Sequence, residues 1–472
     1  MNHTALLSPD EIRSRFSALM SEMYRQEVPQ YGTLLTLVDE VNEAAVARDG
    51  ALRAQFEGGP ERARLDVERH GAIRLGTAQE LHTMRRIFAV MGMEPVGYYD
   101  LSVAGVPVHS TAFRPVEPAA LARNPFRVFT SLLRLELIAD EALRETAAGI
   151  LRGRHIFTPR ALALVGRCEA VGGLTSDEAD AFVCEVRETF RWHRQATVSA
   201  ATYQQLHDAH RLIADVVCFK GPHINHLTPR TLDIDAVQAG MPQHGITPKD
   251  VIEGPPPRRV PILLRQTSFK ALDEPVLFPE ARDGNAGTGG QMGTHTARFG
   301  EIEQRGMALT RKGRALYDAL LQRVRQADGD GSGGETQGHE QRLAQVFAAF
   351  PDDMDDLRRQ GLGFFRYRLT PLGEQASGGA GMVSQDIEAL IGAGLVQAEP
   401  LIYEDFLPVS AAGIFQSNLG GTQRKTCSAQ AAQAAFEAAL GAPVHDEVAL
   451  YEAAERASLA VVKAALSDAV VE

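Results

Sequence analysis

The chain has 472 residues, 44% of them hydrophobic, which is enough for two or three domain-sized units with packed cores. Its 48 Lys and Arg against 60 Asp and Glu give a net charge of −12, and no basic stretch alternates with aromatic residues, so a nucleic-acid partner is not expected. The four cysteines form no Cys-x-x-Cys pair and no apolar run reaches the length of a membrane span, so we expect a cytoplasmic protein without a membrane segment, a disulfide framework or a structural zinc site.

Residues 1–58 are predicted to form a helical lead-in, because apolar residues such as Phe16 and Met20 repeat at helical spacing. Residues 59–117 are predicted to form a module of one strand, one helix and further strands. The first strand is predicted over 65–74, where His70 and Arg74 share one face while the apolar residues Leu65, Val67 and Ile73 occupy the other. This strand is therefore expected to pack on one side and to present chemistry on the other.

The helix of this first module is predicted to begin after Thr77, which forms a capping box with Glu80, and to end at Gly92. Its apolar stripe is Leu81, Met84, Phe88 and Met91. Strand-like runs follow at 96–103 and 106–116.

An inserted helical block is predicted over residues 118–212. Within it we expect one amphipathic helix over 126–143 and another that is capped by Thr175 and Glu178. Both assignments depend on apolar residues that recur at helical spacing.

The strand–helix–strands pattern recurs over residues 213–326, which predicts a second module of the same kind. Its elements are expected to be a strand over 213–228, a short helix opened by Thr247-Pro248, and strands over 260–269, 276–279 and 294–306. Two βαβββ modules could join their sheets into a partly open barrel, a concavity in which small-ligand sites form. The predicted fold class is therefore α+β, with a helical insertion and a C-terminal extension.

Two glycine-rich stretches interrupt these elements. Residues 281–293 lack the Gly-Lys-Ser/Thr of a nucleotide-binding loop and are predicted to be a mobile loop between strands. Residues 327–340 are poor in apolar residues and are predicted to be a flexible linker.

Residues 341–472 are expected to form a C-terminal segment that completes the pocket. It should contain a helix near 343–350, a strand over 364–369 and a helical tail from Ser428. Its loop at 403–413 is rich in groups that can pack or offer backbone hydrogen bonds.

The candidate chemistry lies in His70, His226 and Glu301, which occur at the ends of the first strands of the two modules and in the last strand of the second. Two neutral imidazoles and one carboxylate leave coordination positions open on a metal, as in non-heme Fe(II) oxygenases, although manganese or zinc would also bind such a set. His223 competes with His226, because spacing alone cannot decide which of the two reaches the metal. Glu303 and His295 share the strand face of Glu301 and are further candidates.

Arg74 lies on the same strand face as His70, within reach of whatever a metal at that position binds. A guanidinium group can hold a carboxylate with two parallel hydrogen bonds, and the alternative role of Arg74 is a surface salt bridge. Two other functions use the same residues: a metal-dependent hydrolase or isomerase acting on a small oxo acid, and a non-catalytic protein that binds 2-oxo acids.

Four segments carry a family resemblance. They are Glu68-Arg-His-Gly-Ala-Ile-Arg74, Phe219-Lys-Gly-Pro-His-Ile-Asn-His-Leu-Thr228, Arg298-Phe-Gly-Glu-Ile-Glu303 and Tyr403-Glu-Asp-Phe-Leu-Pro-Val-Ser410. At these segments the chain resembles the 2-oxoadipate dioxygenase/decarboxylases, whose fold is similar to that of the vicinal oxygen chelate superfamily.

The resemblance implies that His70, His226 and Glu301 hold iron(II), with His70 also beside the substrate. It further implies that Arg74 binds a substrate carboxylate and acts in catalysis, and that Val409 and Ser410 line the pocket through their backbone. The implied reaction takes 2-oxoadipate and dioxygen to 2-hydroxyglutarate and carbon dioxide, a step of lysine breakdown. The expected partners are thus a small 2-oxo diacid and O2.

Overall fold

The computed structural model describes residues 5–56, 60–279, 290–329, 336–376, 386–407 and 423–467. The chain divides into two compact units, each built from segments that are far apart in the sequence. Unit one comprises Met1–Glu253, Gln266–Gln304 and Phe406–Val444, and unit two comprises Gly254–Arg265, Arg305–Asp405 and His445–Glu472. Across the described residues, no helix is both long enough and apolar enough to cross a membrane.

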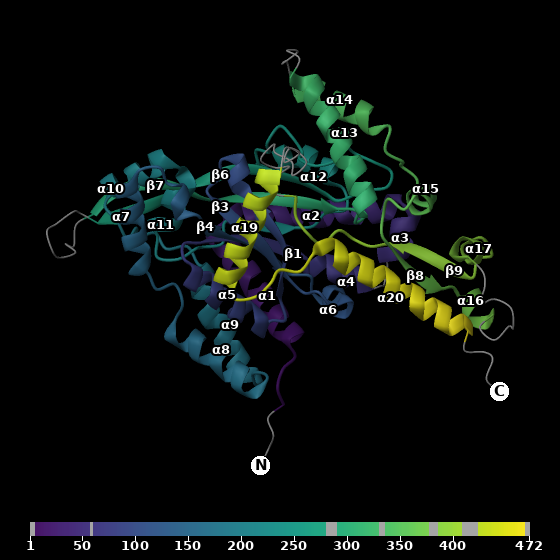
Figure 1. Ribbon diagram of the computed structural model, residues 1–472, viewed down its shortest axis with the longest axis horizontal. Helices are drawn as coiled ribbons and strands as arrows, with labels where there is room; N and C mark the ends of the chain where they lie inside the picture. The colour runs from purple at the N-terminus through teal and green to yellow at the C-terminus, as the bar shows by residue number, and fades with distance from the viewer. Residues whose placement is uncertain are drawn as a thin grey trace. The chain divides into compact units, whose positions relative to one another are not determined.

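Unit one contains a five-stranded sheet in the order β2-β3-β4-β1-β5, of which β1, β3 and β4 are labelled in Figure 1. The strands are β1 Arg69–Leu75, β2 Glu94–Asp100, β3 Val108–Arg114, β4 Arg127–Leu133 and β5 Leu227–Pro229. Strand β1 pairs with β4 in parallel and with β5 in antiparallel orientation, so His70 lies opposite both Arg127 and Thr228. The strand that carries His70 is therefore held on both sides.

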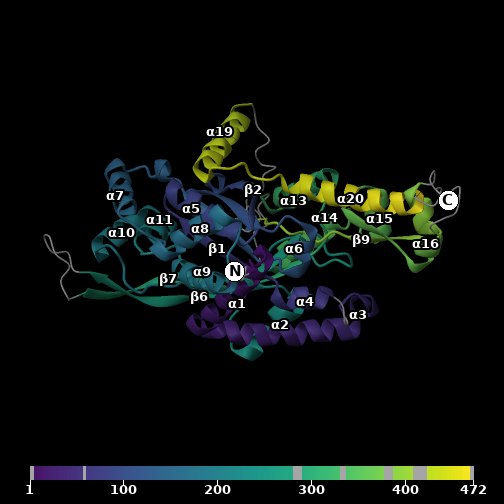
Figure 2. The same cartoon turned by 90° about the horizontal axis from the view of Figure 1, so that it is seen from below.

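Helices surround this sheet, and several of them are labelled in Figure 2. They are α1 Pro9–Glu27, α2 Pro29–Arg48, α3 Gly50–Phe56, α4 Pro60–Val67, α5 Ala78–Val90, α6 Pro118–Arg123, α7 Glu141–Arg152, α8 Pro159–Val171, α9 Ser176–Phe190, α10 Ala200–Ala209, α11 Arg211–Val217, α12 Ile234–Gly240 and α19 Gln423–Leu440. Short 3-10 helices occur at Leu101–Ala104, Leu135–Leu137 and Met241–His244.

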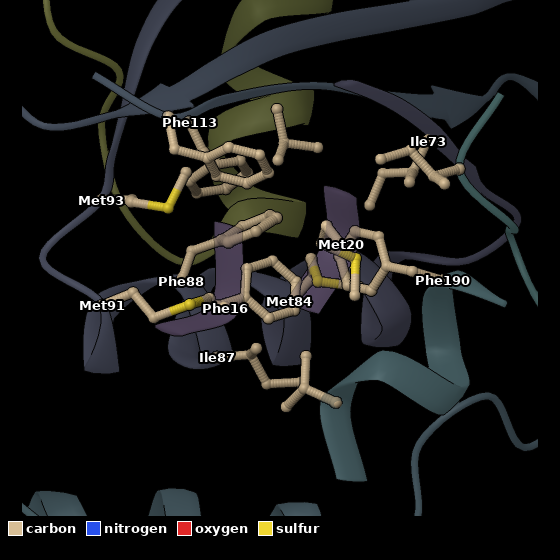
Figure 3. Close-up of a cluster of buried hydrophobic side chains, with 14 of the residues drawn as sticks. Phe16, Met20, Ile73, Met84, Ile87, Phe88, Met91, Met93, Phe113 and Phe190 are labelled. Atoms are coloured by element: carbon tan, nitrogen blue, oxygen red, sulfur yellow. The ribbon is translucent and has the colours of Figure 1, made fainter. Parts of the chain in front are cut away.

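A hydrophobic core joins the sheet to α1, α5 and α9 (Figure 3). The ring of Phe88 in α5 lies 4.6 Å from that of Phe113 in β3, and the ring of Phe16 in α1 lies 5.3 Å from that of Phe190 in α9. All four side chains are fully buried, and burying one of this size contributes roughly 1.5–3 kcal/mol. The core therefore supports the inner side of β1, where Ile73 packs.

The helix that was predicted to begin after Thr77 is confirmed as α5. Thr77 caps it by accepting the N–H of Glu80, and the predicted stripe of Leu81, Met84, Phe88 and Met91 is buried. The carboxylate of Glu80 accepts the N–H of Gly76, one residue earlier than in a capping box. Gly92 ends the helix at a φ of 64°, a left-handed conformation that favours glycine.

Strands β6 Leu264–Pro279 and β7 Gly290–Arg305 form a separate two-stranded sheet. Strand β7 approaches the end of β5 through a parallel bridge between Arg230 and Glu303, where the N–H of Thr231 donates to the carbonyl of Glu303 at 2.7 Å. This contact sets the carboxylates of β7 beside the edge of the five-stranded sheet.

Unit two contains the antiparallel strands β8 Phe365–Leu369 and β9 Val396–Pro400. Its helices are α13 Arg311–Gly329, α14 Thr336–Phe347, α15 Met354–Arg359, α16 Pro371–Ala376, α17 Ile387–Gly392 and α20 Glu447–Ser467. Helix α20 lies along β8 (Figure 1), where the carboxylate of Glu455 accepts the N–H of Phe365 and the hydroxyl of Ser458 accepts that of Tyr367.

The helix predicted over 126–143 is wrong, because residues 127–133 form β4. This strand is buried on nearly every residue, and a strand buried on both faces has a continuous apolar pattern that also fits helical spacing. With β4, the order from β1 onward is strand, helix, two strands, the short helix α6 and a further strand.

The strand predicted over 213–228 is also wrong, because residues 211–217 form α11 and only Leu227–Pro229 is extended as β5. A short apolar run does not distinguish a buried strand from a buried helix. The short helix expected at Thr247-Pro248 is wrong too: Pro248 bridges Phe269, and the helix of this region is α12, which Asp233 caps.

In the second half of unit one, the described order is β5, α12, β6 and β7, one strand short of the predicted module. The mixed α+β class is confirmed, whereas a barrel of two βαβββ modules stays a prediction.

The predicted linker over 327–340 is too long, because α13 reaches Gly329 and α14 begins at Thr336. Of the predicted loop over 281–293, residues 281–289 lie outside the described residues, and β7 begins at Gly290.

Candidate metal and substrate site

His70 is the second residue of β1, and its side chain is 1% exposed. The predicted strand over 65–74, with His70 near its end, is wrong, because the helix α4 begins at Pro60 and runs to Val67. The Nε2 atom of His70 lies 3.2 Å from Oε2 of Glu301, which β7 supplies. Glu301 Oε2 also accepts a hydrogen bond of 2.9 Å from the hydroxyl of Thr228 in β5. Three strands thus position one imidazole and one carboxylate.

His226 immediately precedes β5 and joins this pair, since its Nε2 atom lies 3.3 Å from the same Oε2 of Glu301. Its neighbour Asn225 donates its N–H to Ala72 of β1 and accepts the N–H of Phe299 of β7, which holds the segment between the two strands. Ligand atoms of His70, His226 and Glu301 all lie within 4.8 Å of one another. The group could therefore hold a metal ion, and the structure brings together the three residues that the sequence predicted.

The protonation states suit a cation. Burial lowers the pKa of His226 to about 4, so its imidazole is neutral at neutral pH and keeps a lone pair for a metal. Burial alone would raise the pKa of Glu301, but His226 and His70 lower it overall, so this group is a carboxylate. Burial acts to lower the pKa of His70, but Glu303 and Glu301 raise it overall, so the position favours positive charge.

Glu303 holds the other side of His70, because its Oε2 lies 2.9 Å from His70 Nδ1. Its side chain is fully buried. A carboxylate on the outer nitrogen of a ligating histidine fixes the ring and raises its basicity. Glu303, which shares a strand face with Glu301, is therefore placed to orient the ring of His70 so that Nε2 faces Glu301.

His223 does not belong to this group. Its Nε2 atom lies 3.3 Å from Oδ1 of Asp215, and the adjacent Ile224 donates its N–H to the carbonyl of Phe190. Tertiary contacts thus set His223 against Asp215 and His226 beside Glu301, so His226 is the better ligand candidate of the two that the spacing left open. His295 also lies outside the group of three, with its Nε2 2.9 Å from Asp215.

A cavity of about 260 Å³ opens beside the group. This volume lies just below the roughly 300–1,000 Å³ of drug-sized pockets, so it fits a small molecule. Its polar lining is His70, Arg74, Ser131, His226, Gln266 and Glu301. Its apolar lining is Ala72, Ile73, Leu101, Val106, Val108, Phe129, Leu212, Phe406 and Leu407.

Arg74 lines this cavity and also donates a hydrogen bond of 2.8 Å from Nη1 to Oδ2 of Asp215. Its side chain is 26% exposed and that of Asp215 is 7% exposed. The pair is therefore not a surface salt bridge, which was the alternative role considered for Arg74. Arg74 is thus a cation at the wall of the cavity that contains the candidate ligands.

Several site residues had no motif in the sequence, among them Ser131, Asp215, Gln266, Phe406 and Leu407. The one usable signal was Asp215, a charged residue inside an apolar run, which indicates a buried partner. Val409 and Ser410 lie outside the described residues.

The family model described as 2-oxoadipate dioxygenase/decarboxylase matches residues 16–418. A protein of that name from Escherichia coli is 60% identical over 452 residues, which cover 96% of this chain and 98% of the relative. Another from Pseudomonas putida is 59% identical over 462 residues, which cover 98% of each chain. The crystal structure of the hydroxyglutarate synthase in complex with 2-oxoadipate from Pseudomonas putida has a TM-score of 0.88 and 57% identity, covering 98% of this chain and 99% of that one. The chain belongs to the 2-oxoadipate dioxygenase/decarboxylase family.

Proposed function

We propose that this protein is an Fe(II)-dependent dioxygenase that converts 2-oxoadipate and dioxygen to 2-hydroxyglutarate and carbon dioxide, as a step of lysine breakdown. The observation that carries the proposal is the convergence of His70, His226 and Glu301 on a small cavity that also contains the cation Arg74. The names and the 2-oxoadipate complex of its close relatives support the choice of substrate.

His70, His226 and Glu301 would hold the iron through two imidazole nitrogens and one carboxylate oxygen, a donor set that suits ferrous iron and leaves positions for other ligands. When bound, ferrous iron would supply the redox centre at which dioxygen reacts with the 2-oxo acid end of the substrate. Glu303 would keep the ring of His70 turned toward the metal, and Thr228 would do the same for the carboxylate of Glu301.

Arg74 would bind the distal carboxylate of the diacid, because the C1 carboxylate and the C2 ketone are the groups that suit a metal. The apolar wall of the cavity, which includes Val106 and Phe129, would pack against the methylene carbons and exclude water. Val409 and Ser410, by the family resemblance, would line the pocket through their backbone. In the balanced reaction C1 leaves as carbon dioxide, and the two atoms of O2 end in the new carboxylate and the new hydroxyl group.

The metal assignment is tested with His70→Ala, His226→Ala and Glu301→Ala, each loaded anaerobically with ferrous iron and assayed for bound iron and for 2-hydroxyglutarate. We expect each to lose iron binding and turnover, because two of the three donors do not hold the ion. His223→Ala is the matched control, since this buried histidine faces Asp215 instead, and it should retain iron. Loss of iron in His223→Ala with retention in His226→Ala would contradict the assignment.

Two outcomes would favour the other functions that use this site. Turnover with zinc or manganese and without oxygen uptake would indicate a hydrolase or isomerase. Binding of 2-oxoadipate without any product, even in the iron-loaded protein, would indicate a binding protein.

A further inference from the structure

A buried carboxylate, Asp215 of α11, lies directly behind Arg74 and uses both of its oxygens. Its Oδ2 accepts the hydrogen bond from Arg74 Nη1 at 2.8 Å. Its Oδ1 lies 2.9 Å from Nε2 of His295 and 3.3 Å from Nε2 of His223. Asp215 therefore joins the cation of the cavity wall to two buried histidines.

The contacts continue beyond His295. The hydroxyl of Tyr203 in α10 lies 2.8 Å from His295 Nδ1, and as a donor there it leaves Nε2 of the imidazole to donate its proton to Asp215. The ring of Trp192 stacks on that of His295 at 6.1 Å between centroids and meets the ring of His223 edge-on at 4.7 Å. Asp215 is thus held in place by groups that cannot easily turn.

Arg74 also helps to stabilise the charge of Asp215. Burial alone would raise the pKa of this carboxyl, but His223 and Arg74 hold it well below its ordinary value. A buried carboxylate is stable only where it is paired and hydrogen-bonded. Moving the guanidinium of Arg74 away would remove one of the groups that stabilise this buried charge, so the pair opposes rotation of Arg74.

Arg74 keeps donors for a ligand. Among the described residues, the structure gives its guanidinium a hydrogen bond to Asp215 through Nη1, and the group has five N–H donors in all. The remaining donors belong to a side chain that lines the cavity. A guanidinium fixed on one side can offer its other edge to a carboxylate with two parallel hydrogen bonds.

We propose that Asp215 is a positioning residue that fixes Arg74, with Tyr203 and His295 behind it, and that it thereby sets the preference of the site for a diacid. This inference rests on the proposed function, in which Arg74 binds the distal carboxylate. Asp215 acts through Arg74, because among the described residues it is not one of those that line the cavity.

The test measures kcat and KM on 2-oxoadipate and on 2-oxohexanoate, a monoacid of equal chain length that lacks the distal carboxylate. Asp215→Asn keeps the size of the side chain but removes its charge, and misplacing a binding group by about 1 Å can cost on the order of 100-fold. We expect kcat/KM on 2-oxoadipate to fall about 10- to 100-fold, mainly through KM, at unchanged iron content. The monoacid should change less than about threefold, since it does not use Arg74.

A double-mutant cycle shows whether Asp215 acts through Arg74. Adding Asp215→Asn to Arg74→Ala should cause no further loss of kcat/KM on 2-oxoadipate, because the group that Asp215 positions is already gone.

Asp273→Asn is the matched control, an exposed aspartate that accepts a hydrogen bond from Thr296, and it should leave kcat/KM on both substrates unaffected. Tyr203→Phe removes only the hydroxyl that contacts His295, at the end of the contacts behind Asp215. It should reduce turnover of the diacid selectively, and it provides a test even if Asp215→Asn folds poorly.

Equal losses on both substrates in Asp215→Asn and Tyr203→Phe would overturn the positioning role and leave Asp215 a structural residue. Losses that multiply in the double mutant would overturn it as well, because Asp215 would then act independently of Arg74. Failure of the proposed function looks different: the wild-type protein would form no 2-hydroxyglutarate, or Arg74→Ala would affect the diacid and the monoacid equally.

Discussion

His70 has a carboxylate on each side of its ring, with Glu301 3.2 Å from Nε2 and Glu303 2.9 Å from Nδ1. The two carboxylates have different tasks in our account. Glu301 would share the metal with His70, whereas Glu303 would orient the imidazole and increase its basicity. Both side chains come from β7, two residues apart, so they lie on the same face of that strand.

Glu303→Gln is predicted to weaken metal binding without abolishing it. Loss of an outer carboxylate typically lowers metal affinity about 10- to 100-fold, because the ring is less basic and less well oriented. Anaerobic titration with ferrous iron, or with Co(II) as a spectroscopic probe, measures the effect. Glu117→Gln is the control, an exposed glutamate before α6 whose side chain makes no capping hydrogen bond. Unchanged affinity in Glu303→Gln would show that Glu303 does not support His70.

Two of the three metal-ligand candidates, His70 and Glu301, lie in strands that the sequence pattern indicated. The third, His226, was picked from a predicted strand that is wrong, since it precedes β5 and follows a helix. The choice between His223 and His226 could not be predicted, since it depends on Asp215, which another element supplies. Phe406 was equally hidden, because its ring reaches His70 at 5.0 Å only through the tertiary fold. Contacts between distant segments leave no periodic signal in the sequence.

At the scale of elements, β1 and β4 show what periodicity can and cannot provide. In β1 the alternation is partial: His70, Ala72 and Arg74 line the cavity and Leu75 belongs to the core, whereas Ile73 belongs to the core and also borders the cavity. β4 is buried on both faces, so it has no alternation to detect. The helix α5 could be predicted because two independent signals, its N-terminal cap and its apolar stripe, indicate the same helix.

Another element, α19, is predicted to make the protein sensitive to acid through its packing on β3. Its Phe436 ring lies 4.7 Å from that of His109, and burial, assisted by Arg134, lowers the pKa of His109 to about 4. In the unfolded chain this pKa is about 6.5, so the unfolded state binds more protons between these values. The stabilisation is complete above about pH 6.5 and is lost as the pH falls toward 4, by at most about 3 kcal/mol.

Melting temperatures measured from pH 7 to pH 4.5 test this effect. His109→Gln cannot take up the proton, so its melting temperature should fall less steeply with decreasing pH than that of the wild type. His155→Gln, at an exposed position, is the control and should keep the wild-type slope. Identical slopes for all three proteins would show that His109 does not contribute.

At the scale of the whole molecule, the cavity of unit one needs a segment from late in the chain. The chain leaves unit one after Gln304 and returns at Phe406, and both Phe406 and Leu407 line the cavity. The same returning segment contains α19, which packs on α5, where Arg85 donates to the carbonyl of Leu440. Unit one is therefore incomplete without residues that follow most of unit two.

A chain that ends at residue 340 is predicted to be inactive, because it lacks Phe406–Val444 of unit one. Phe406→Ala tests the same point in the full chain, where it should reduce turnover about tenfold or more by leaving the cavity open to water. Phe347→Ala, which removes a buried ring of unit two, is the matched control: it should lower the melting temperature but preserve kcat/KM. Full activity of a soluble 1–340 fragment would contradict the prediction.

The central claim is that the group of His70, His226 and Glu301 supports an iron-dependent reaction of 2-oxoadipate with dioxygen. The most direct measurement is oxygen uptake by the anaerobically iron-loaded wild-type protein, with carbon dioxide and 2-hydroxyglutarate quantified in the same sample. Our account predicts one molecule of each product for every molecule of O2 consumed, and no uptake in the protein loaded with zinc. Conversion of 2-oxoadipate without oxygen uptake, or oxygen uptake without 2-hydroxyglutarate, would contradict it.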